Sequence, residues 1–184
     1  MENLNFTAID FEAANASKLS AISAGYAVVR GGEVIKTGTW IINPHTGLDN
    51  FNPYAVRIHG ITPEHAAAGE PLETSIRRLL DIIGDGPVLA HGMKYDRGIL
   101  TAGCREFGLP KPANEFRCTL TLAKTVLQLD KLRLSAVTEA LGLPAYAAHD
   151  SGADALACAR VALAIAERQG AQTITGLYKG LGIS

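Results

Sequence analysis

The feature that most constrains this chain is a short apolar segment that ends in two carboxylates. Residues 6–12, Phe-Thr-Ala-Ile-Asp-Phe-Glu, have the composition of a buried β-strand, with Asp10 and Glu12 two positions apart. Because side chains alternate between the faces of a strand, both carboxylates point to the same side. Like charges repel there, and burial removes hydration worth several kcal/mol for each ion. A divalent cation offsets both effects because hard cations bind carboxylate oxygens. The alternative is an ordinary strand that ends in a polar turn, and this segment alone does not decide between the two.

The composition is that of a globular protein. The chain has 184 residues, of which 47% are hydrophobic and 19% charged, and this favours one domain with a sizeable core. A formal net charge of −1 argues against strong non-specific binding to nucleic acid but not against a local site. The 3 cysteines contain no C-x-x-C pair, which argues against a zinc site or disulfide framework and favours a reducing compartment. We see no signal peptide and no membrane-spanning run, and therefore expect a cytoplasmic protein without a membrane partner.

Hydrophobic periodicity and turn residues predict an α/β fold. Residues 22–29 and 34–42 flank the turn signal at Gly31-Gly32 and are expected to form a hairpin that continues the first strand as an antiparallel meander. Residues 43–71 hold four prolines and are expected to form a long ordered loop, in which Thr62 begins a helix. Further strands are predicted at 88–90 and 116–118, and helices at 72–83, 91–107, 120–127, 134–141 and 149–168, the last with Asp150 as its N-cap.

Two further acids stand in the first turns of predicted helices. Asp96 follows the strand at 88–90, which places it at the carboxyl end of the sheet, where open α/β sheets hold ligands. Asp154 begins a segment, residues 153–166, that is apolar nearly all round and is therefore expected to be buried. The helix dipole favours a negative charge there by only about 0.3–1 kcal/mol, which is too little to offset deep burial. A metal ion or a paired base is the better account of Asp154, and His149 lies five residues before it.

In this order, the acids and histidines resemble the motifs of the DEDD exonuclease superfamily, in its DnaQ-like DEDDh branch. The D-x-E motif of that branch matches residues 10–12, and its H-N-x-x-F-D motif resembles residues 91–96, His-Gly-Met-Lys-Tyr-Asp. Its H-x-x-x-x-D motif is similar to residues 149–154, and its H-G-I-T segment to residues 59–62. Each motif alone is weak evidence. Their order and spacing over residues 6–168 make the resemblance specific.

The chain departs from the family pattern at three positions. Ala13 stands where Thr is frequent, Gly92 replaces Asn, and Tyr95 replaces Phe. None of them is an expected metal ligand, so these departures concern substrate positioning. The resemblance implies an RNase H-like fold, with a central mixed sheet of about five strands flanked by α-helices. Residues 1–170 would form the exonuclease domain, and residues 171–184 a tail that docks locally or leads to another module.

The activity implied by the resemblance is metal-dependent 3′–5′ exonuclease action, releasing nucleoside monophosphates from the 3′ end of single-stranded DNA or RNA. Two divalent cations, Mg²⁺ or Mn²⁺, would clamp the attacking and leaving oxygens of an in-line displacement. His149 is the candidate general base, because an imidazole titrates near working pH and a loop lets the ring swing towards the water. The implied metal ligands are Asp10, Glu12, Asp96 and Asp154.

Six residues are expected near the substrate by the same resemblance. Phe11 and the backbone around Ala13 and Ala14 would meet the terminal nucleotide, and His59 and Ile61 would pack against its base or sugar. His91 either contacts the substrate or supports the site, and we favour the supporting role.

Other function classes remain open. One is a two-metal phosphodiesterase acting on small nucleotides, against which the H-G-I-T segment and the third motif argue. Another is a nucleic-acid-binding domain without catalysis, against which the intact set of candidate ligands argues. A plain α/β domain with surface acids leaves Asp154 unexplained. The choice between DNA and RNA is undecided, because we identify no partner for a 2′-hydroxyl. A polymerase partner for proofreading and assembly as a homodimer also remain open.

Overall fold

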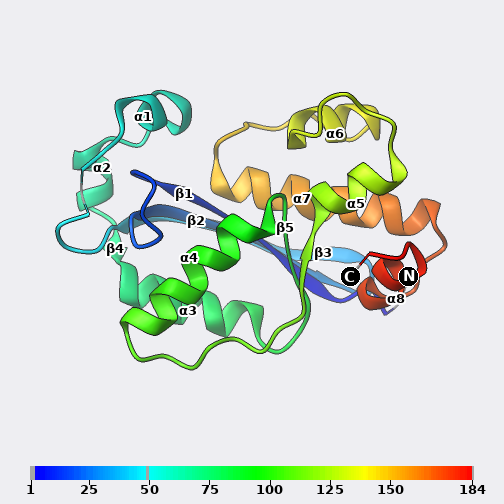
Figure 1. Cartoon of the computed structure of the whole chain (residues 1–184), viewed down its shortest axis with the longest axis horizontal. Coiled ribbons are helices and arrows are strands. Elements are labelled where there is room, and N and C mark those ends of the chain that lie inside the picture. The colour runs from blue at the N-terminus through cyan, green and yellow to red at the C-terminus, as the bar shows by residue number, and fades with distance from the viewer. Residues whose placement is uncertain (1–2, 49, 184) are drawn as a thin grey trace.

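A six-stranded mixed sheet forms the centre of the computed structural model, which describes residues 3–48 and 50–183 (Figure 1). The strand order is β4-β3-β2-β1-β5-β6. The first three strands form the antiparallel meander predicted from the hairpin signal, and the other three pair in parallel with their neighbours. The strands are β1 (Phe6–Ala13), β2 (Ala21–Arg30), β3 (Glu33–Asn43), β4 (Glu70–Pro71), β5 (Val88–Ala90) and β6 (Phe116–Cys118).

The α/β fold class is confirmed, and five of the strands were expected. The sixth, β4, has two residues and pairs with the end of β3, a length at which no sequence period can be recognised. The hairpin β2–β3 lies on one side of β1 and the pair β5–β6 on the other. Strand β1 therefore occupies an interior position of the sheet.

Residues of β1 alternate between two apolar cores. Phe6 and Ala8 belong to the core beneath α7 (Ser151–Arg168), whereas Ile9 and Phe11 belong to the core beneath α3 (Leu72–Ile83). This alternation explains why β1 is apolar at successive positions, since both of its faces are covered by helices.

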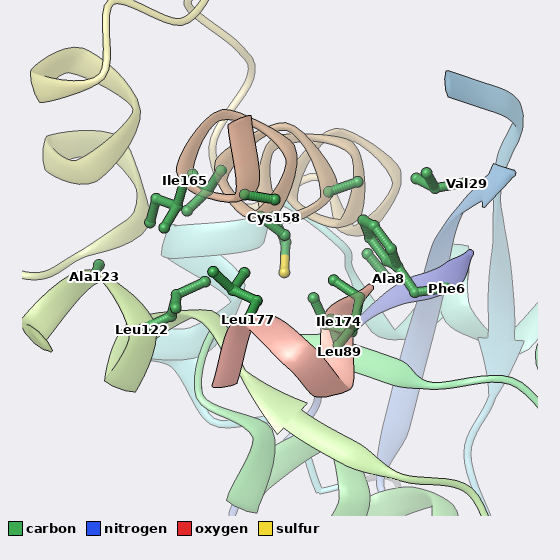
Figure 2. Close-up of a cluster of buried hydrophobic side chains, with 14 of the residues drawn as sticks. Phe6, Ala8, Val29, Leu89, Leu122, Ala123, Cys158, Ile165, Ile174 and Leu177 are labelled. Atoms are coloured by element: carbon green, nitrogen blue, oxygen red, sulfur yellow. The ribbon is translucent and has the colours of Figure 1, made fainter. Parts of the chain in front are cut away.

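Helices cover both faces of the sheet (Figure 1). α3 and α4 (Met93–Glu106) form one layer, and α5 (Thr119–Val126), α6 (Leu134–Ala140) and α7 belong to the other. Figure 2 shows the core beneath α7, in which the Cys158 side chain projects from α7 between the sheet and the other helices. Cys158 is 1% exposed, as expected for the nearly all-apolar helix that the sequence predicted.

The segment expected to be a long loop contains two short helices, α1 (Pro53–His59) and α2 (Pro63–Ala67). The side chain of Thr62 caps α2 by accepting the His65 N–H, which confirms the predicted helix start. Helix α1 was not expected. Asn52 caps it from the side chain and Pro53 follows in the first turn, so the usual start signal was present.

The C-terminal segment also carries a helix, α8 (Ile174–Gly180). Ile174 and Leu177 insert into the core beneath α7 (Figure 2), and Tyr178 is 1% exposed. Residues 171–183 thus dock on the domain. Across the described ranges, no helix combines the length and the apolarity required to cross a membrane.

Candidate active site

Three carboxylates converge where β1 meets the start of α7. Asp10 and Glu12 project from the same face of β1, and Asp154 faces them from the first turn of α7. One oxygen from each carboxylate can be chosen so that all three lie within 4.8 Å of one another. The predicted co-orientation of Asp10 and Glu12 therefore brings both into one cluster with an acid that lies far along the chain.

The close approach of α7 to the sheet depends on Gly25 of β2, which pairs with Asp10. A Cβ atom built on Gly25 would lie 2.0 Å from the carbonyl oxygen of Ser151 and 2.4 Å from the Gly152 nitrogen. Both contacts are to backbone at the start of α7, and no side-chain rotation can relieve them. The absence of a side chain at Gly25 thus allows Asp154 to reach the β1 carboxylates.

Asp96 joins the acid set from the other helical layer. Its carboxylate is 3% exposed, and Oδ1 accepts the backbone N–H of Phe11 at 3.1 Å. Strand β5 pairs with β1 only at Thr7 and Ala8, so the Phe11 N–H needs another acceptor. Asp96 satisfies that donor and is at the same time the charge that most raises the pKa of Asp10.

The pKa of each of the four carboxyls is raised above its ordinary value. Burial is the largest cause in each case. Burial and the negative charges of Asp154 and Asp96 raise the pKa of Glu12 to about 7. Burial also raises the pKa of Asp96 to about 7, although two backbone hydrogen bonds oppose this effect. Within residues 3–48 and 50–183, no lysine or arginine forms an ion pair with any of the four. Such a concentration of uncompensated carboxylate oxygens fits a hard divalent cation.

His149 lies at the edge of the acid cluster. Its backbone N–H donates to Oδ2 of Asp154 at 2.6 Å, and its ring Nδ1 lies 3.9 Å from Oε1 of Glu12. The residue has φ 69°, in the left-handed region, and its side chain is 55% exposed. The next residue, Asp150, caps α7 by accepting the Ala153 N–H, as predicted. The imidazole therefore stands beside the carboxylates on an exposed loop.

Tyr146 is a site residue that no sequence motif indicated. Its hydroxyl donates a hydrogen bond to the Asp154 carboxylate, and burial together with the negative charge of Asp154 raises the pKa of Tyr146. The ring packs against the core beneath α7. Nothing in the loop that precedes His149 signals this contact, because it depends on how that loop folds back over α7.

A pocket of about 340 Å³ opens beside His149. His59 and Ile61, two of the expected substrate-binding residues, line it together with His149, Thr39 and Trp40. Nδ1 of His59 accepts the Ile61 N–H at 3.1 Å. Nε2 of His59 is buried and has no hydrogen-bond partner in the described part of the chain. The structure thus brings these two residues to the imidazole and leaves one buried polar atom available.

The other expected substrate-binding residues are engaged within the protein. The Phe11 side chain is 4% exposed and packs in the core beneath α3, so only its backbone borders the site. Ala13 is buried where β1 pairs with Ala21 of β2. The Ala14 N–H donates to Ser20, and its carbonyl accepts the Asn52 N–H.

His91 has both ring nitrogens within hydrogen-bond distance of protein atoms. Nδ1 lies 3.0 Å from Oγ1 of Thr119, and Nε2 lies 2.7 Å from the carbonyl oxygen of Leu132. Burial lowers the pKa of His91, and the Leu132 carbonyl opposes that effect. These contacts tie the loop after β5 to α5 and to the segment before α6, which is a supporting arrangement.

The comparison with protein families agrees with this geometry. The family model RNase_T, described as Exonuclease, matches residues 7–162. The chain belongs to this exonuclease family. The match covers all four carboxylates, His149 and the pocket beside it, so the acid cluster lies inside the shared domain.

Curated relatives contain the domain as a small part of a longer chain. A Mycobacterium tuberculosis protein named "Putative bifunctional exonuclease/endonuclease protein" is 28% identical over 153 residues, which cover 82% of this chain and 23% of the relative. A PolC-type DNA polymerase III of Thermotoga maritima is 26% identical over 164 residues, covering 88% of this chain and 12% of the polymerase. The chain thus spans less than a quarter of either relative.

Solved structures show the RNase H-like exonuclease fold. Escherichia coli exonuclease I, in complex with a dA16 oligonucleotide, matches with a TM-score of 0.78 at 19% identity, covering 91% of this chain and 42% of the enzyme. Exonuclease X, in complex with 5′ overhanging duplex DNA, matches with a TM-score of 0.75 at 21% identity, covering 96% of this chain and 99% of that chain. The fold implied by the sequence resemblance is confirmed.

Proposed function

We propose that this protein is a metal-dependent 3′–5′ exonuclease that releases nucleoside monophosphates from the 3′ end of single-stranded DNA or RNA. The observation that carries the proposal is the convergence of Asp10, Glu12 and Asp154 within 4.8 Å, with the imidazole of His149 3.9 Å from Glu12. Membership of the exonuclease family supports the reaction class. The oligonucleotide in the exonuclease I structure supports single strands as the substrate.

The carboxylates are proposed as the ligands of two divalent cations, Mg²⁺ or Mn²⁺. Asp10, Glu12 and Asp154 present the oxygen cluster, and Asp96 adds a fourth negative charge beside Asp10. Cations bound there would stabilise the attacking and leaving oxygens of a phosphodiester displacement. Because the pKa of Glu12 and of Asp96 is raised to about 7 without a cation, ion binding and carboxyl deprotonation are coupled.

His149 is proposed to accept the proton of the attacking water. Its exposed position on a loop allows the ring to turn towards a water above the carboxylates. The hydrogen bond from the His149 backbone to Asp154 holds the base and a ligand in one unit. The terminal nucleotide would occupy the pocket lined by His59 and Ile61, where Nε2 of His59 is a buried polar atom without a partner among the described residues.

The three free cysteines support a reducing compartment, and we propose the cytoplasm. Similarity to a segment of a PolC-type polymerase makes proofreading beside a polymerase one candidate role. End processing of RNA and degradation of short fragments are the others.

The test is digestion of 5′-labelled single-stranded DNA and RNA in Mg²⁺, in Mn²⁺ and in EDTA. We expect a ladder that shortens from the 3′ end in the presence of a divalent cation and not in EDTA. Relative rates on the two substrates would give the sugar preference. Absence of a ladder from both substrates with either cation would contradict the proposal and favour a small-nucleotide phosphodiesterase or a binding domain.

A further inference from the structure

A second hollow, of about 910 Å³, lies along α4, the helix that carries Asp96. We call it the α4 groove. Its lining contains five cationic side chains and no acidic ones. The five cations come from the β1–β2 loop, from α4 and from the segment after α4. They are Lys18, Lys94, Arg97, Arg105 and Lys111.

The cations of α4 form a stripe on one side of the helix. Lys94, Arg97 and Arg105 are separated by three and eight residues, spacings that return to one helical face. The stripe extends about 16 Å, at 1.5 Å per residue. None of the five cations forms an ion pair within residues 3–48 and 50–183. In an otherwise near-neutral chain, this concentration of unpaired positive charge calls for an anionic occupant.

Lys18 connects the α4 groove to the acid cluster. Its stem crosses α4 at Gly98, where an added Cβ would lie 3.1 Å from Cε of the lysine. Its Nζ lies 3.7 Å from the ring centroid of Tyr95, and Lys18 is the cation that acts on Asp96. Burial, followed by the negative charges of Glu12 and Asp96, raises the pKa of Tyr95. Lys18 therefore belongs to the lining of the groove and acts on a carboxylate of the proposed catalytic site.

The lining of the α4 groove also contains apolar side chains. Met93, Cys104 and Leu109 line it, and Met93 and Cys104 are buried. A lining of cations interspersed with apolar side chains suits a single nucleic-acid strand, whose phosphates carry the charge and whose bases have apolar faces. An acidic polypeptide has the charge but not the alternating planar apolar groups.

We propose that the α4 groove binds the phosphate backbone of a single strand upstream of its 3′ end. The strand would run from the acid cluster past Tyr95 and Lys18 towards Arg105 and Lys111. This proposal rests on the proposed exonuclease function, because that function places the 3′ end at the start of α4. The groove then determines affinity for long strands, whereas the acid cluster determines hydrolysis.

The test replaces the two groove cations that lie furthest beyond Asp96 along the chain, in the variant R105Q/K111Q; Arg105 is about 13 Å along α4 from Asp96. Glutamine keeps much of each side-chain stem and removes the charge. The matched control is K124Q/K179Q, which neutralises two exposed lysines outside the groove. Binding of a fluorescent oligothymidylate is measured in EDTA over a range of salt. Turnover is measured in Mn²⁺ on a long strand and on a dinucleotide, which is too short to reach the replaced residues.

For the groove variant we expect the salt slope of binding to fall by about 1.4, from 0.7 for each of two phosphate contacts, whereas the control retains the wild-type slope. A fourfold rise in salt would then weaken wild-type binding roughly 7-fold more than variant binding. On the long strand, kcat/KM should fall because KM rises, whereas the rate on the dinucleotide should stay unchanged. Unchanged binding by the groove variant, an equal loss in the control, or equally tight wild-type binding of polyglutamate would overturn the proposal.

The oligonucleotide-binding measurement in EDTA does not depend on turnover. An active enzyme whose groove variant binds normally would contradict the groove and leave the exonuclease function intact. An inactive protein whose groove variant loses oligonucleotide binding would contradict the exonuclease function and leave the groove as a strand-binding surface.

Discussion

The backbone N–H of His149 donates to Oδ2 of Asp154 at 2.6 Å, so the proposed base and a proposed metal ligand are joined by a main-chain bond. The imidazole takes no part in this bond. Removal of the ring therefore leaves the position of Asp154 unchanged, provided that the backbone at residue 149 keeps its left-handed conformation, with φ 69°.

This geometry makes His149→Gly a cleaner test of general-base catalysis than His149→Ala. Glycine adopts positive φ without strain, whereas alanine does not. We expect His149→Gly to lower kcat by about 10²–10⁴-fold with unchanged Mn²⁺ affinity, as measured by single-turnover digestion and by calorimetric titration. His149→Ala should show the same loss of kcat together with a lower melting temperature. Normal turnover of the glycine variant would remove His149 from the mechanism.

Asp154→Asn tests the ligand assignment. The amide oxygen can still accept the His149 N–H, but it is neutral and binds a divalent cation less strongly. We expect digestion to be abolished and Mn²⁺ binding to be weakened, while the circular dichroism spectrum stays that of the wild type. Asp81→Asn, on the exposed side of α3, is the charge-matched control. A variant with near-normal activity would contradict the role of Asp154.

The Tyr146 hydroxyl is hydrogen-bonded to Asp154, and Tyr146→Phe removes this bond while keeping the ring. Loss of a residue that supports a metal ligand typically lowers metal affinity or activity by about 10–100-fold. We expect the Mn²⁺ concentration for half-maximal rate to rise within that range, with a smaller change in kcat at saturating Mn²⁺. Tyr54→Phe, at a tyrosine that is 66% exposed, is the control. An unchanged Mn²⁺ dependence would show that the hydroxyl does not orient Asp154.

The raised carboxyl pKa values predict how stability depends on pH in the absence of a divalent cation. A pKa that is higher in the folded state means that the folded protein binds more protons than the unfolded chain, so these groups make stability fall as pH rises. For Glu12 the window runs from the ordinary 4.5 to about 7. We expect the melting temperature in EDTA to fall by about 5–10 °C across this window. Mg²⁺ should raise it at pH 7.5 much more than at pH 5.

The double variant Asp10→Asn/Glu12→Gln serves as the control for this pH dependence. It removes two of the groups that titrate, so its melting temperature in EDTA should vary less between pH 5 and pH 7.5 than that of the wild type. Equal pH dependence in the two proteins would mean that the acid cluster does not set the stability of the cation-free state.

Gly25→Ala tests whether the spacing between α7 and β2 positions Asp154. A Cβ at residue 25 would lie 2.0 Å from the Ser151 carbonyl oxygen, so α7 must shift away from the β1 carboxylates. We expect weaker Mn²⁺ binding together with a destabilisation of several kcal/mol, measured by denaturant unfolding. Gly86→Ala, where an added Cβ meets nothing within 4 Å, is the control. Wild-type metal affinity in Gly25→Ala would show that the site tolerates this shift.

The sequence was most informative where periodicity and chemistry coincided. The alternation of β1 predicted that Asp10 and Glu12 share a face, and the all-apolar pattern of α7 made Asp154 exceptional. Contacts that depend on tertiary packing and on the path of a loop were not predictable in this way. The Ala14 N–H is engaged by Ser20, the Phe11 side chain lies in the core, and Tyr146 reaches Asp154 only through the path of its loop.

Short elements were missed for a related reason. α1 has seven residues and no buried ones, so it has no hydrophobic stripe, although its Asn52 cap and Pro53 could have indicated it. α8 likewise spans only seven residues, and its three buried side chains are stabilised by a core built from distant segments. Tertiary packing rather than local preference determines such elements.

The acid cluster and the α4 groove separate the charges of a chain whose formal sum is −1. Without a divalent cation, the carboxylates would repel the phosphates at a strand terminus, while the proposed groove would still attract those further along. The cation would therefore have to bind before the strand terminus can occupy the acid cluster, which would give the two binding steps a fixed order. When divalent cations are scarce, the same molecule would hold a strand by its interior and leave the end intact, so that ion supply decides between retention and degradation.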